Sequence, residues 1–159
     1  MSYTIRIFCR AETPVTLSEL AEAATEGGFL DQEPRFDPDP ESVEGDNPEW
    51  RSLLLIWSTG KQPIVFHNHF RDDALREQIQ QLMFILEVSR KTNPRQRLVD
   101  HLQQSVRMFQ IEMSREEMTE SMWALLDAVE ARLAKKCDGI VFTKDEGFFD
   151  QDLKHFYKL

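Results

Sequence analysis

The chain has 159 residues and a mass of 18.7 kDa, of which 41% are apolar, 30% charged and 10% aromatic, a composition that suits one globular domain over 1–159. The composition and the N-terminus argue against two classes of protein. No apolar run approaches the roughly 20 residues of a membrane span, and the N-terminus lacks a charged-then-apolar secretory pattern. We therefore predict a protein of the cytoplasm with no membrane partner.

The net charge of −9 is concentrated in residues 31–49. That stretch carries eight acids and one base, Arg35, and so accounts for seven of the nine net negative charges. The rest of the chain is nearly neutral. Binding to nucleic-acid phosphates needs clustered positive charge, so this distribution argues against nucleic acid and favours a basic protein partner.

The first two elements have clear local signals. Residues 3–9 alternate between two faces, which predicts a strand. Thr16 and Glu19 have the spacing of a capping box, in which each side chain satisfies a backbone N–H at the start of a helix. Apolar residues then recur at helical spacing, and two glycines stop the pattern. This predicts a helix from about 17 to 26.

Residues 31–49 come next and hold four of the seven prolines as well as the eight acids. Such a composition cannot build a core, so we predict a mobile loop that can contain a short strand around Arg35 and Phe36. The candidate partner-binding residues in this loop are Asp37, Asp39, Glu41, Glu44, Asp46 and Glu49.

The middle of the chain predicts a hairpin followed by a helix. Residues 53–57 form a continuous apolar run of strand length, and 63–70 follow after a polar turn. Asp72 or Asp73 can cap the next helix, which has an apolar stripe and is broken before Pro94.

The last third predicts two helices and two strands. We expect a short helix over 95–103, a strand over 106–113, a helix over 115–136 behind a capping box at Ser114, and a strand over 140–143. Four aromatic side chains follow and are expected to dock on the body: Phe148, Phe149, Phe156 and Tyr157.

The predicted element order indicates an α+β fold. We expect a mostly antiparallel sheet of about five strands with the helices on one face. The first β-α-β-β-α-β portion is compatible with a ferredoxin-like core, to which the last helix and strand would add a C-terminal α-β extension.

Several short motifs resemble a family of small uncharacterised bacterial α+β proteins. They are Phe8-Cys9-Arg10, Thr13 to Leu17, Trp57 to Ile64, Asp138 to Val141 and Glu146 to Phe149. The resemblance covers scattered turn and cap signals over most of the chain. It implies a bacterial source and this kind of fold, and it implies no activity, cofactor or catalytic residue.

His67 and His69 are the sharpest local feature. Alternate residues of a strand share a face, so the two imidazoles project together and could ligate zinc. Asp72 and Asp73 are close enough in sequence to add an oxygen ligand, although no further ligand follows at zinc-hydrolase spacing. The alternative is two surface histidines on the solvent face of an edge strand.

No other catalytic pattern is present. The sequence has no phosphate-binding glycine loop, no nucleophile elbow and no zinc-protease motif. Cys9 and Cys137 have neither a CxxC nor a metal-ligand spacing, so we expect free thiols, with Cys9 in the core. We therefore predict no cofactor.

Three functions are compatible with these features. The first is a non-catalytic binding protein, of the inhibitor or immunity type, that contacts a basic partner through the acidic segment. The alternative for this segment is a solvated loop that only keeps the protein soluble. The second is a metal-dependent or small-molecule enzyme that uses His67 and His69. The third is a structural homodimer that pairs through the long helix over 115–136 and its Trp123.

Overall fold

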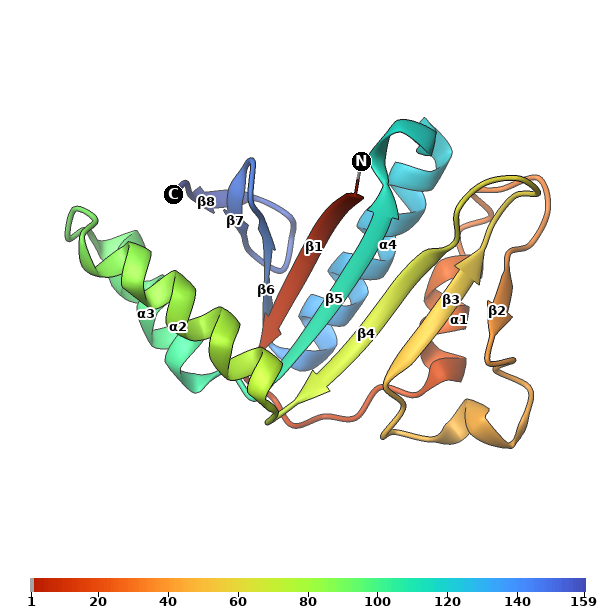
Figure 1. Cartoon of the computed structure of the whole chain (residues 1–159), viewed down its shortest axis with the longest axis horizontal. Coiled ribbons are helices and arrows are strands. Elements are labelled where there is room, and N and C mark those ends of the chain that lie inside the picture. Colours follow the sequence, from red (N-terminus) through yellow and green to blue (C-terminus); the bar gives the residue numbers. More distant parts are fainter. Residues whose placement is uncertain (1) are drawn as a thin grey trace.

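The computed structural model describes residues 2–159, and one eight-stranded sheet runs through the chain (Figure 1). The strand order is β2-β3-β4-β5-β1-β6-β7-β8, and every neighbouring pair is antiparallel. The strands are β1 (Ser2–Cys9), β2 (Arg35–Asp37), β3 (Ser52–Ile56), β4 (Ile64–Phe70), β5 (Arg107–Ser114), β6 (Gly139–Thr143), β7 (Gly147–Phe149) and β8 (His155–Tyr157).

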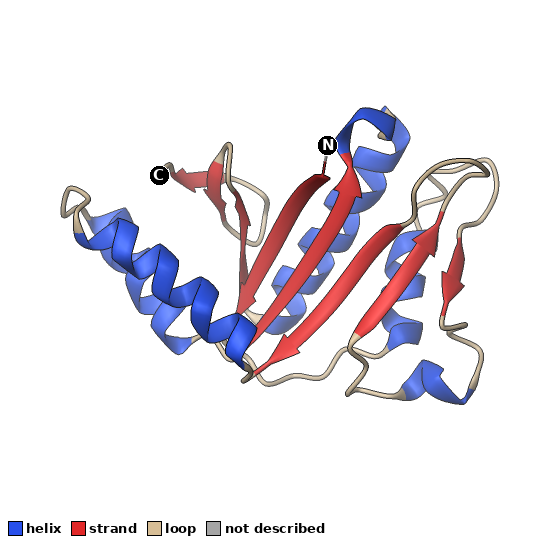
Figure 2. Cartoon of the chain, in the orientation of Figure 1, coloured by secondary structure: helices blue, strands red, loops and turns tan. Residues whose placement is uncertain are grey.

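Four α-helices and two short 3-10 helices connect the strands (Figure 2). They are α1 (Leu17–Thr25), η1 (Val43–Asp46), α2 (Asp73–Glu87), α3 (Asn93–Gln104), η2 (Arg115–Glu117) and α4 (Glu120–Cys137). No helix among residues 2–159 is both long and apolar enough to cross a membrane.

Side-chain caps fix where the helices begin. Thr16 and Asp72 accept from the backbone N–H groups of Glu19 and Leu75, as the sequence predicts. The prediction at Ser114 is wrong, because that residue is still paired in β5. The helix behind it begins only after Thr119, which accepts from the N–H of Met122 at 3.2 Å.

The sheet has an apolar core on each face. On one face α1 and α4 cover side chains of the central strands such as Ile7 and Phe109. On the other face α2 and α3 pack around Phe8, Met108 and Phe148. Figure 1 shows α1 and α4 behind the strands, whereas α2 and α3 extend to the left of the central strands. The prediction that all helices cover one face is therefore wrong for α2 and α3.

The α+β class and the mostly antiparallel sheet are confirmed, but the sheet has eight strands rather than about five. The three additional strands are β2, β7 and β8, each of three residues. The sequence suggested a short strand at β2, whereas β7 and β8 are too short for a sequence period to show. The ferredoxin-like core is not confirmed. The prediction placed this core in the first β-α-β-β-α-β portion of the chain. There β5 lies between β1 and β4 and pairs with both, whereas a ferredoxin-like fold has β1 directly beside β4.

Candidate functional site

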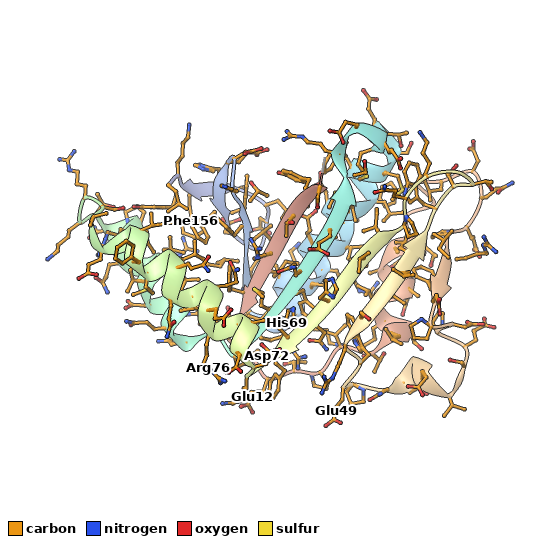
Figure 3. All side chains as sticks on the ribbon, viewed as in Figure 1. Glu12, Glu49, His69, Asp72, Arg76 and Phe156 are labelled. Carbon is orange, nitrogen blue, oxygen red and sulfur yellow. The ribbon has the colours of Figure 1, made fainter. Side chains whose placement is uncertain are left out.

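A large cleft lies where the end of β4 meets the start of α2. It has a volume of about 940 Å³, and residues 48–52 form its opposite wall. Figure 3 shows Glu12, His69 and Asp72 gathered at this end of the sheet, with Glu49 nearby. The structure thus brings the predicted histidine pair next to the end of the acidic segment, two features that the sequence analysis treats as unrelated.

Both histidines project from the same face of β4, as predicted, and their rings stack with centroids 6.0 Å apart. However, β4 is an internal strand with β3 and β5 beside it, so the prediction of an edge strand is wrong. His67 Nε2 lies 3.1 Å from a carboxylate oxygen of Glu112, and His69 Nδ1 lies 2.9 Å from one of Asp72. Each ring is therefore oriented by its own carboxylate.

The carboxylate partners are themselves held in place. The second oxygen of Asp72 caps α2, and Glu112 accepts from the amide of Gln110, whose own oxygen accepts from the guanidinium of Arg6. This network crosses the part of the sheet face that no helix covers. Each of the two carboxylates therefore has a second hydrogen-bond partner besides its histidine.

Zinc binding by His67 and His69 stays a prediction. Within residues 2–159, no three His, Cys, Asp or Glu side chains form a group that could hold a metal ion. Zinc sites in proteins have three or four protein ligands. We expect elemental analysis of untagged protein to give less than about 0.1 zinc per chain, and a ratio near one, lost in a His67→Asn variant, would instead support the enzyme hypothesis.

Arg107 lines the same cleft and was missed by the sequence analysis. Its side chain is buried, and one N–H donates to the side-chain oxygen of Asn68 at 2.7 Å. The guanidinium also lies over the ring of Phe70, 4.7 Å from its centroid. Burial lowers the pKa of Arg107, and the neighbouring thiols of Cys9 and Cys137 oppose this shift. Arg107 therefore stabilises the end of β4 through its amide and aromatic contacts.

The acidic segment is anchored at several points rather than a free loop. Ser18 of α1 donates to the carbonyl oxygens of Pro40 and Gly45, within 3.0 Å of each. A side chain at Gly45 could not fit, because its Cβ would lie 1.7 Å from the Pro40 carbonyl oxygen. At the end of the segment, the indole N–H of Trp50 donates to the carbonyl of Val15 at 2.6 Å. The segment therefore packs on α1, and its mobility stays a prediction.

The strand suggested around Arg35 and Phe36 is present as β2. It pairs with β3, and it forms the edge of the sheet. Phe36 packs against the core that α1 and α4 cover. The acidic segment therefore belongs to the folded body at both of its ends.

The carboxylates of this segment all face solvent. Within residues 2–159, none of the eight forms an ion pair. Val43, at the start of η1, is 97% exposed among them. Val43 is thus an exposed apolar side chain within a strongly negative segment.

The helix proposed for pairing two copies is used inside the fold. Trp123 of α4 is half-buried, and its ring meets Tyr3 edge-on at 5.8 Å. Trp123 therefore packs against Tyr3 of its own chain. The homodimer itself stays a prediction.

Comparisons with known proteins give no match. No family model matches the chain, and no curated protein or solved structure is significantly similar to it. The site described above therefore rests on the chain's own geometry, and no family is assigned to it.

Proposed function

We propose that the protein is a non-catalytic binding module that holds a basic partner protein against its acidic segment. The observation that carries the proposal is the array of eight exposed carboxylates, unpaired within residues 2–159, on an anchored segment. A flexible chain would lose conformational entropy on binding, whereas an anchored one is already ordered.

The charge of the segment supports this function in two ways. A cluster of like charges attracts an oppositely charged partner over about one Debye length, roughly 8–10 Å at moderate salt, and raises the association rate. The carboxylates around η1 also have no cation to release before they pair with a partner. The cleft beside Glu49 gives the partner a concave surface next to the charges.

The first test is neutralisation of the charges around η1. We expect the triple variant Glu41→Gln, Glu44→Gln, Asp46→Asn to bind the partner at least tenfold more weakly, mainly through slower association, because rim charges act on the association rate. The wild-type affinity should fall steeply with salt, and that of the variant should fall less. Capture from a lysate of the source cells identifies the partner, and titration of the purified partner at about 0.05 and 0.3 M salt gives the affinities.

The matched control neutralises three acids on α2 and α3 instead: Glu77→Gln, Glu87→Gln, Asp100→Asn. Those residues are exposed on α2 and α3, so the control has the same net charge as the test variant. Its affinity should equal that of the wild type. A partner that binds both variants equally well, or no partner retained by the wild type, would contradict the proposed function.

Val43 provides a test that does not depend on charge. We expect Val43→Asp to weaken binding at least tenfold, because it places a charge at the apolar centre of the contact. The side chain is almost fully exposed, so the free energy of unfolding should change by less than about 0.5 kcal/mol. Urea denaturation and calorimetry of the same preparation measure both quantities.

A further inference from the structure

A second cavity lies at the other end of the sheet, between α4 and the C-terminal strands. Its volume is about 340 Å³. Its lining residues come from β1, α4, β6, the turn before β7, and β7. Figure 1 shows where these elements lie in the fold. Trp123, Asp127 and Glu130 of α4 are spaced by four and three residues, so they share the helix face that lines it.

Glu130 is the unusual group in this cavity. Its side chain is only 5% exposed, and its Oε2 has no hydrogen-bond partner among residues 2–159. Burial first, and then the charges of Asp127 and Glu146, raise the pKa of Glu130 to about 8. Buried acids in proteins are normally paired with a cation or fully hydrogen-bonded. Glu130 therefore has an unused acceptor that a bound ligand could satisfy.

All the charged side chains that line the cavity are acidic. They are Asp127 and Glu130 of α4 and Glu146 of the turn before β7, and no Lys, Arg or His from residues 2–159 joins them. Burial followed by the charge of Glu146 also raises the pKa of Asp127. Arg115 lies 4.7 Å above the ring of Tyr3 but is already paired with Asp145 at 2.9 Å. The cavity therefore has an excess of negative charge.

The remaining walls are largely aromatic and apolar. Tyr3, Trp123 and Phe149 line the cavity from three different elements. Aromatic faces attract cations, most strongly ammonium groups shielded from water, and apolar walls accept an alkyl chain. Acids combined with aromatic rings thus select a positively charged organic group over a neutral or an anionic one.

We propose that this cavity binds a small organic ammonium cation, whose N–H groups donate to the unpartnered oxygen of Glu130 while its alkyl chain lies against the aromatic wall. A volume of about 340 Å³ is at the small end of ligand sites. The same chemistry is offered by a free alkyl diamine and by a lysine side chain. A metal ion is not the occupant, because the described residues hold no group of three ligands arranged for one.

This site does not rest on the proposed function. The cavity is bounded by β6 and β7, whereas the acidic segment contributes β2 at the opposite edge of the sheet. Variants in one region leave the other intact, so each proposal can fail alone.

The test is calorimetric titration of the full chain with 1,5-diaminopentane. We expect binding at about pH 8.5 and an affinity roughly 20-fold lower at about pH 6.5, because the ligand needs the ionised carboxylate of Glu130. At the lower pH, binding of the diamine should release close to one proton from Glu130. This release makes the measured heat of binding depend on the ionisation enthalpy of the buffer. Asp127, Glu146 and Tyr3 also face this carboxylate, so the titration is analysed over the whole pH range.

Glu130→Gln should bind the diamine at least tenfold more weakly and should lose the pH dependence. Glu120→Gln, an exposed acid on the same helix, is the matched control and should bind as the wild type does. Nα-acetyl-lysine methylamide is titrated in parallel. If it binds more tightly than the diamine, the ligand of the cavity is a lysine side chain. If it binds more weakly, the ligand is a free amine. The proposal is overturned if the diamine does not bind at pH 8.5, if pentan-1-ol binds equally well, or if Glu130→Gln binds like the wild type.

Discussion

Replacing Glu130 by glutamine is expected to stabilise the ligand-free protein at alkaline pH by about 3–5 kcal/mol. The pKa of this carboxyl is about 8 in the folded chain, against an ordinary value of 4.5. Between these two values the folded state holds a proton that the unfolded state has released. The free energy of unfolding therefore falls as pH rises from about 4.5 to about 8, and it levels off above that.

Glutamine has nearly the same shape as the protonated acid and cannot ionise. The variant should thus match the wild type near pH 4.5 and exceed it increasingly up to about pH 8.5. Urea denaturation at several pH values gives the free energies. Glu120→Gln is the control, and its difference from the wild type should not change with pH above about 5.5. A constant difference between Glu130→Gln and the wild type would show that Glu130 ionises normally in the fold.

Replacing Trp50 by alanine is the second large effect, a destabilisation of about 3–5 kcal/mol. The indole is 5% exposed and stacks on Phe109, with ring centroids 6.2 Å apart. Its N–H donates to the carbonyl of Val15, which lies just before α1. The alanine variant loses this packing, leaves a cavity and leaves the Val15 carbonyl without its donor.

The same change should release the acidic segment, because Trp50 fixes its C-terminal end. We expect a protease specific for glutamate to cleave residues 31–49 much faster in Trp50→Ala than in the wild type. Trp50→Phe keeps an aromatic ring beside Phe109 but loses the hydrogen bond and part of the buried indole, so it should cost less than Trp50→Ala, about 1–3 kcal/mol. Urea denaturation and timed proteolysis measure the two effects. A Trp50→Ala variant that is as stable and as resistant as the wild type would show that the indole does not anchor the segment.

Most strands and helices could be predicted because their signals are local. The alternation in β1, the continuous apolar run in β3 and the caps at Thr16 and Asp72 each depend on a few neighbouring residues. The same kind of signal failed at Ser114. The pattern there fits a capping box, but pairing with β1 extends β5 through that residue. A longer-range hydrogen-bond ladder thus displaced the helix start to Thr119.

The functional residues were only partly predictable. His67 and His69 share a face because alternation along a strand guarantees it, but their carboxylate partners come from β5 and from the N-cap of α2. Glu130 looks like a solvated residue of an amphipathic helix. The sequence signal for its burial was its spacing from Trp123 and Asp127. These three residues form a second stripe on α4, next to the apolar stripe that packs on the sheet.

The sequence by itself determined the α+β class, the caps of α1 and α2, the paired orientation of the histidines and the concentration of charge in residues 31–49. Each depends on residue type and short-range spacing. Only the tertiary structure decided that the acidic segment packs on α1, that α2 and α3 cover the second face, and that Glu130 is enclosed. The physical reason is that burial depends on which distant elements come to lie over a side chain: β7 and the turn before it, more than ten residues further along the chain, complete the cavity around Glu130.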